Sequence, residues 1–220
     1  MFIGHFGVAL AAKRVAPRTS LGTLILGAQF LDLLWPILLL LGMEHVRIAP
    51  GITKVSPFDF YDYPISHSLA TATGWSVPVG GIYFLVRRYA RGSWNVGLAV
   101  LSHWVLDFLV HRPDLPLWPR GPCVGLELWD SWAASSALEV LFFGAGLAIY
   151  LATTAPRDAI GRYVFGLLMA LLFLGWISTL LSGPPPSVNA LAWGALTMWI
   201  TVPWGCWADS HRTVKLPLPA

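Results

Sequence analysis

The chain has 220 residues, of which 56% are hydrophobic and only 11% are charged. A soluble domain carries about 25% charged residues, so this composition excludes an ordinary water-soluble globular protein and indicates one that crosses a membrane several times. The net charge of +3 does not indicate a nucleic-acid partner, because the basic residues are spread over the stretches that flank the apolar runs. Cys123 and Cys206 fall on opposite sides of the predicted membrane, so we expect no disulfide between them.

The first half of the chain contains four apolar segments that we predict to be helical. They cover about residues 1–12, 20–43, 64–86 and 94–110. The first is shorter than the roughly 20 residues that a full span needs, and we expect Lys13 and Arg14 after it to extend toward the membrane surface. It has no basic stretch at its start and no small-residue cleavage site, so we expect no cleaved signal peptide. The second is interrupted by Asp32 and Pro36, and a carboxylate at mid-span indicates a functional role.

Three further apolar helices are predicted in the second half, at about residues 131–153, 159–181 and 187–207. An irregular loop rich in proline and tryptophan, residues 112–130, precedes them. The prediction is therefore an all-α, polytopic membrane bundle of about seven segments with a short first one. It is a single integral membrane domain over residues 1–220, in which residues 1–120 carry the buried polar groups and residues 121–220 are supporting helices.

The lysines and arginines are distributed unequally between the two sides of these segments. Ten fall on one side, and four fall on the other. Because basic loops are retained in the cytoplasm, the larger set predicts an outward-facing N-terminus and a cytoplasmic C-terminus. The larger set is Lys13, Arg14, Arg18, Arg87, Arg88, Arg91, Arg157, Arg162, Arg212 and Lys215. The smaller, outer set is Arg47, Lys54, Arg112 and Arg120.

Six histidine and aspartate side chains share the outer half of the predicted membrane. They are His5, Asp32, Asp62, His67, His103 and Asp107. The spacing of His103 and Asp107 places both on one face of a helix, where each needs a partner if it is buried. The simpler reading is a hydrogen bond that only satisfies these two groups. The common level of all six favours a site for one or two divalent ions, zinc above all, with iron or manganese as alternatives.

Other polar residues stand close to the predicted ligands in the sequence. Ser66, Ser68 and Ser102 are expected to orient the ligands. Asp62 is a candidate sixth ligand or general base, and Asp32 is a further catalytic candidate. Candidates for substrate binding are Arg112, Arg120, His111 and Glu139. For the two arginines and His111 the alternative is a solvated loop position, and for Glu139 it is structural pairing.

Four short motifs occur in order along the first 120 residues. They are Gly4-His5, Leu31-Asp32-Leu33-Leu34-Trp35-Pro36, Ser66-His67-Ser68, and Ser102-His103 with Asp107, followed by Leu115-Pro116-Leu117-Trp118-Pro119. In this order they resemble the bacterial inner-membrane, metal-dependent hydrolases known as LexA-regulated membrane-bound hydrolases. Two of the motifs depart from that family's pattern. Leu34 replaces the second aspartate of Pro-Asp-x-Asp, and Asp62-Tyr63-Pro64 replaces His-Arg-Gly, which puts the metal count, the metal identity and the hydrolytic activity in question.

The resemblance implies a multi-pass protein of a bacterial-type inner membrane. Together with the polar residues it predicts a hydrolase that acts at the outer bilayer face on a lipid or lipid-linked phosphoester, or on a small molecule, by metal-activated water. One alternative is a non-enzymatic metal or proton transporter, which would need polar groups that continue through the inner halves of the helices, where few are found. Another is an assembly protein with a structural metal.

Overall fold

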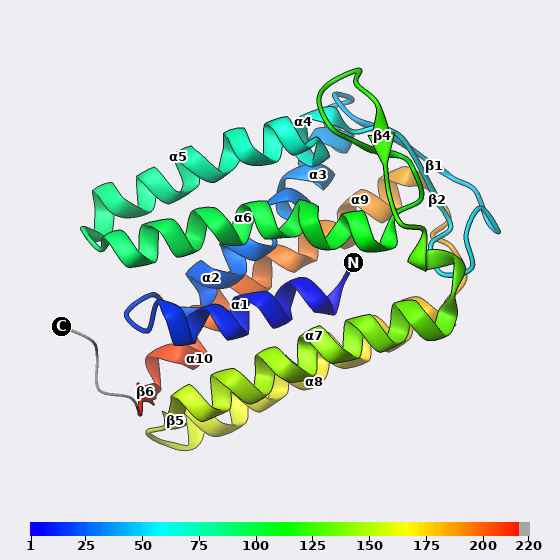
Figure 1. Cartoon of the computed structure of the whole chain (residues 1–220). Helices are drawn as coiled ribbons and strands as arrows, with labels where there is room; N and C mark the ends of the chain where they lie inside the picture. Colours follow the sequence, from blue (N-terminus) through cyan, green and yellow to red (C-terminus); the bar gives the residue numbers. More distant parts are fainter. Residues whose placement is uncertain (216–220) are drawn as a thin grey trace.

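A computed structural model describes residues 1–215, and these are mostly helical (Figure 1). The helices of the first half are α1 (Ile3–Val15), α2 (Leu21–Ala28), α3 (Phe30–Leu40), α4 (Pro64–His67), α5 (Leu69–Arg87) and α6 (Ala90–Val110). Those of the second half are α7 (Trp132–Thr153), α8 (Ala159–Leu181), α9 (Val188–Leu196) and α10 (Thr201–Ser210), with 3₁₀ turns at Leu128–Asp130 and Thr197–Ile200. All lie close to the segments predicted from hydropathy.

Four helices, α5 to α8, are long and apolar enough to cross a membrane. Helices α2 and α3 together make a fifth candidate span, bent by 58°. A polytopic membrane protein is thus supported by four or five candidate spans, whereas seven segments are not shown. Helix α1 has only 13 residues, and the last segment is divided between α9, a 3₁₀ turn and α10.

The second segment bends at Gln29, whereas the sequence predicted interruptions at Asp32 and Pro36. Gln29 ends α2 and begins α3, while Pro36 lies inside α3 without ending it. The carbonyl oxygen of Ala28, the last residue of α2, accepts a hydrogen bond from His103 of α6. The bend therefore places Asp32 in the first turn of a new helix, beside α6.

The helices run back and forth between two ends of the bundle (Figure 1). At one end, called the basic end here, lie the α1–α2, α5–α6 and α7–α8 connections and strand β6 (Arg212–Val214). At the other, the hairpin end, lie β1 (His45–Ile48) paired with β2 (Phe58–Asp62), and β3 (Leu115–Pro116) paired with β4 (Cys123–Val124). All these pairs are antiparallel, and β3 and β4 lie within the irregular loop expected at residues 112–130. At the basic end, β5 (Thr154–Pro156) pairs with β6.

Helix α1 lies at the centre of the bundle, packed against α7, α2 and α6. Ile3, Phe6 and Leu10 on it are fully buried. The contact with α7 depends on glycine, because a Cβ atom on Gly7 or on Gly146 would collide with the backbone of the facing helix. This close approach fixes α1 in the core and, with it, the position of His5.

The expectation that Lys13 extends to the membrane surface is wrong. Lys13 is buried, and its Nζ lies 2.6 Å from Asp209 Oδ2 on α10. Tyr150 of α7 donates to the other carboxylate oxygen of Asp209 at 2.6 Å. We call these three residues the Lys13 cluster.

Candidate metal centre

Five of the six predicted histidine and aspartate side chains come together in the bundle. They are His5 of α1, Asp32 of α3, His67 of α4, and His103 and Asp107 of α6, called the His/Asp cluster below. Their ligand atoms form two groups, His5 with His103 and Asp107, and Asp32 with His67 and His103. Within each group these atoms lie within 4.8 Å of one another, and His103 belongs to both. Four segments distant in sequence therefore converge on one buried point.

Asp107 links the three histidines. Its Oδ1 lies 3.1 Å from His5 Nε2, and its Oδ2 lies 3.2 Å from His103 Nε2 and 3.8 Å from His67 Nε2. The rings of His5 and His103 are stacked, with centroids 3.7 Å apart. Every histidine thus directs its Nε2 toward the same carboxylate.

Asp32 closes the opposite side of the cluster. Its Oδ1 lies 3.4 Å from His67 Nε2 and 3.6 Å from His103 Nε2. The side chain of Asp32 is 24% exposed, whereas that of Asp107 is 3% exposed. Asp32 is therefore the carboxylate more open to its surroundings.

The ring of His103 is held in the orientation of a ligand. Its Nδ1 lies 2.7 Å from the carbonyl oxygen of Ala28, which can only accept, so Nδ1 carries the hydrogen. In the neutral ring Nε2 then bears a lone pair directed at the carboxylates. This buried atom has no hydrogen-bond partner among the described residues. An imidazole fixed through Nδ1 with a free Nε2 among carboxylates could hold a metal ion.

The three predicted orienting serines differ in what they contact. Ser66 Oγ lies 2.7 Å from His67 Nδ1, so it touches a cluster histidine. Ser68 instead caps α5 by accepting from the backbone N–H of Thr71, and Ser102 donates to a backbone carbonyl of its own helix.

Glu139 caps the helix that carries His5. Its two carboxylate oxygens accept from the backbone N–H groups of Phe2 and Gly4 at 2.6 and 2.7 Å. Helix α1 has no side-chain cap of its own, so this carboxylate from α7 neutralises the donors of its first turn. The backbone nitrogen of Met1 lies 2.6 Å from Asp107 Oδ1. Together these contacts hold the start of α1 against the cluster.

Asp62 is not brought into the His/Asp cluster. It lies on β2, and its carboxylate pairs at 2.8 Å with His45, with both side chains about half exposed. His111 is buried outside the cluster, where its Nδ1 lies 2.9 Å from Asp114 Oδ1 and 3.3 Å from Tyr63 Oη. Burial lowers the pKa of His111, because it penalises the charged ring. The reading of His111 as a solvated loop residue is therefore wrong.

The two outer arginines proposed for substrate binding have different surroundings. Arg112 is engaged in the protein itself, with its Nε donating to Asp114 at 3.0 Å and a terminal nitrogen donating to Asp59. Arg120 lies in the exposed connection between β3 and β4, with a φ of 62°. Neither side chain belongs to the His/Asp cluster.

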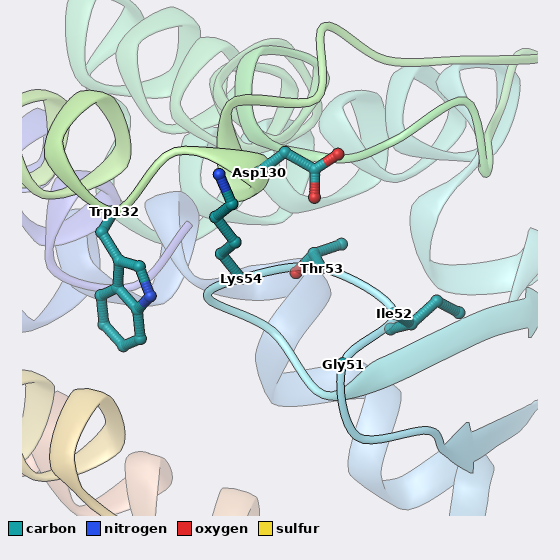
Figure 2. Close-up of a pocket in the computed structure, with 6 residues that line it drawn as sticks. All are labelled: Gly51, Ile52, Thr53, Lys54, Asp130 and Trp132. Carbon is teal, nitrogen blue, oxygen red and sulfur yellow. The ribbon is translucent and has the colours of Figure 1, made fainter.

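A cavity of about 750 Å³ adjoins the cluster, and Asp32, His67 and Asp107 form part of its wall. Much of the rest is apolar, including Trp35, Phe60, Trp129, Trp176, Leu180, Leu191 and Met198. A shallower pocket of about 720 Å³ at the hairpin end is lined by residues 51–54, Asp130 and Trp132. Figure 2 shows Lys54 reaching from the β1–β2 loop toward the segment that carries Asp130. Lys54 and Trp132 line both spaces, so the pocket adjoins the cavity.

Sequence reasoning missed Glu44, which is buried and contacts Ser66. In the sequence it is an ordinary polar residue between a helix and a loop, and nothing nearby marks it as buried. Compared with models of protein families, with curated proteins and with solved structures, the chain gives no match.

Proposed function

We propose that this protein is a membrane-embedded hydrolase that uses a divalent metal ion to cleave a lipid or lipid-linked ester, and most of all a phosphoester. The observation that carries the proposal is His103, a buried ring whose free Nε2 faces Asp32 and Asp107 beside a large cavity. A divalent ion held by imidazole and carboxylate groups supplies a Lewis acid that polarises an ester oxygen and acidifies water. Zinc fits this donor set best, and iron or manganese also fit it.

The shared histidine limits how many ions the cluster holds. Both three-residue groups include His103, and a neutral imidazole offers one lone pair at Nε2. One ion therefore uses His103, and a second would depend on the remaining donors of the other group. We propose His5, Asp32, His67, His103 and Asp107 as the ligand set, without Asp62.

The cavity wall supports the proposed substrate class. Its aromatic and aliphatic residues suit an acyl or prenyl chain, while Asp32 and His67 face the polar part of a ligand. The pocket around Lys54 gives water and a polar headgroup access from the hairpin end. Asp32 is the more exposed carboxylate of the cluster, so it is the residue proposed to accept a proton from the attacking water.

The proposed topology has seven membrane segments, with the N-terminus outside and the C-terminus in the cytoplasm of a bacterial-type inner membrane. It is supported by the ten lysines and arginines whose segments meet at the basic end, against four at the hairpin end. The hairpin end then faces outward, and the His/Asp cluster lies in the outer half of the bilayer. The four motifs that resemble the membrane-bound hydrolases also support a location in a bacterial-type inner membrane.

Metal content tests the proposal directly. The protein is purified in detergent without chelator, and zinc, iron and manganese are quantified for wild type, His103→Ala and the control His211→Ala. His211 pairs with Asp158 at the basic end, far along the chain from the cluster. We expect about one ion per chain in wild type and control, and almost none in His103→Ala, since catalytic sites of this kind depend on three or four protein ligands.

Hydrolysis is then measured on phospholipid esters in mixed micelles. His103→Ala is expected to lose at least about 100-fold in turnover, whereas His211→Ala keeps the wild-type rate. Equal metal content in wild type and His103→Ala would contradict the proposed site. Metal binding without hydrolysis of any ester would favour an ion-binding protein instead.

A further inference from the structure

Glu44, between α3 and β1, is a carboxylate buried without a cation. It is 1% exposed, and within residues 1–215 no lysine, arginine or histidine forms an ion pair with it. Its oxygens are instead satisfied by one short segment. Oε1 accepts from the backbone N–H groups of Ile65 and Ser66 at 2.7 and 2.8 Å, and Oε2 accepts from Ser66 Oγ at 2.6 Å. These three donors compensate the burial of the carboxylate, and one of them, Ser66 Oγ, also contacts the cluster histidine His67.

The contact with Ser66 sets the direction of a hydrogen-bond chain. A serine has one O–H, and here it is donated to Glu44. Ser66 Oγ can then only accept from His67 Nδ1, which lies 2.7 Å away. The ring hydrogen of His67 is thereby placed on Nδ1, and Nε2 is left with a lone pair toward Asp32 and Asp107.

His67 differs in this respect from His103. The partner of His103 Nδ1 is a carbonyl oxygen, which fixes the tautomer without help. The partner of His67 Nδ1 is a hydroxyl, which can donate as readily as it accepts. At Nδ1, the residue on the far side of the hydroxyl, Glu44, decides whether the hydroxyl donates or accepts.

We infer that Glu44 is a positioning residue that acts through Ser66 to hold His67 in its metal-binding tautomer and so sets the metal affinity of the His/Asp cluster. The inference rests on the proposed metal site and goes beyond it, because Glu44 itself does not touch the ion. Partners of this kind typically change metal affinity by about 10- to 100-fold when they are removed.

Glu44→Gln tests the direction of the hydrogen-bond chain, because it changes the side-chain volume very little. The amide oxygen still accepts from the backbone of Ile65 and Ser66, whereas the amide nitrogen donates to Ser66 Oγ. Ser66 then donates to His67 Nδ1, which favours the ring hydrogen on Nε2, where it competes with coordination. We expect the zinc dissociation constant, measured by competition with a chromophoric chelator, to rise about 10- to 100-fold.

Ser66→Ala separates this effect from a structural one. It removes the hydrogen-bond chain without reversing its direction, so we expect a smaller loss of zinc affinity than with Glu44→Gln. In the double variant the amide can no longer reach His67 through a hydroxyl, so zinc affinity returns to the level of Ser66→Ala alone. A purely structural role of Glu44 would instead add the two losses.

Asp158→Asn is the matched control for the change from carboxylate to amide. Like Glu44, Asp158 accepts from a backbone N–H, that of Gly161 at a helix start, and from a side chain, here His211 Nδ1. It lies at the basic end. We expect its zinc affinity to equal that of wild type.

The tautomer of His67 is read in the wild-type protein by ¹⁵N NMR with labelled histidine, assigned by loss of the signal in His67→Gln. Hydrogen on Nδ1 is expected, and hydrogen on Nε2 would overturn the inference without any variant at Glu44. Zinc binding by wild type with unchanged affinity in Glu44→Gln would also overturn it while leaving the metal site intact. Absence of zinc binding by wild type would reject the proposed function itself.

Discussion

Two buried polar clusters lie along the central helix α1, one near each of its ends. Near the basic end, Lys13 pairs with Asp209 at 2.6 Å, and Tyr150 donates to the second oxygen of that carboxylate. Lys13 Nζ also donates to a backbone carbonyl, and Asp209 also accepts from a backbone N–H. One positive and one negative charge are thus paired, and their polar atoms are satisfied within the protein.

Near the hairpin end the pairing is incomplete. His103 Nε2 and His5 Nδ1 are buried without hydrogen-bond partners among the described residues. Asp107 contacts His5, His67 and His103, whereas Asp32 contacts only His67 and His103. The backbone nitrogen of Met1 lies 2.6 Å from Asp107 Oδ1, but no lysine or arginine side chain within residues 1–215 pairs with either carboxylate. Because buried polar groups are nearly always satisfied, the complete cluster fits a structural role, and the incomplete one beside a cavity fits the proposed metal site.

The largest effect that sharpens this comparison is expected from Lys13→Met. Removing one partner leaves Asp209 as an uncompensated buried charge, so we expect a loss of about 3–5 kcal/mol of stability. Thermal unfolding in detergent measures it, and the metal content of the folded protein should equal that of wild type. Adding Asp209→Asn should recover part of the loss, because the amide keeps an acceptor for Tyr150. Loss of metal from folded Lys13→Met would show that the two clusters are not independent.

Removal of the proposed metal ion should affect only the His/Asp cluster, and its effect on stability should be the second largest. A ligand that binds only the folded state stabilises it by about 2.7 kcal/mol at 100 times its dissociation constant, so chelation should lower the melting temperature of wild type reversibly. Lys13→Met should show the same decrease from its lower starting point. His103→Ala should show none, and a response of that variant equal to wild type would place the metal elsewhere.

The positions of the helices could be predicted because they depend on local composition. Apolar runs of membrane-spanning length, bounded by basic residues and prolines, give α5 to α8 nearly as the structure has them. The His/Asp cluster could be anticipated for a related reason. A histidine or aspartate inside an apolar helix needs a partner wherever that partner comes from.

The partners themselves could not be predicted, since they depend on contacts far apart in sequence. Lys13 pairs with Asp209, which is 196 residues away in the sequence, so the prediction that Lys13 lies at the membrane surface was wrong. Asp62 lies only a few residues before His67, yet the β1–β2 hairpin turns it toward His45. Glu44 accepts a hydrogen bond from Ser66, 22 residues later in the sequence, and neither residue alone indicates a buried carboxylate.

The smallest effect on stability is expected from Asp158→Asn. Asp158 pairs with His211 at the basic end, where the buried pair of Lys13 and Asp209 also lies, but its pair is exposed. Hydrogen bonds from the backbone of Gly161 and from His211 lower the pKa of Asp158 below its usual value of 3.8. Because the folded state favours the charged form, the stabilisation is present above about pH 4 and is lost as the pH falls through the lowered pKa. Melting temperatures of wild type and Asp158→Asn should therefore differ slightly at pH 7 and converge in strong acid. Water screens the exposed pair of Asp158 and His211, so we expect its loss to cost much less stability at pH 7 than Lys13→Met does. An equally large loss would mean that breaking an ion pair at the basic end is costly even when no buried charge is left unpaired.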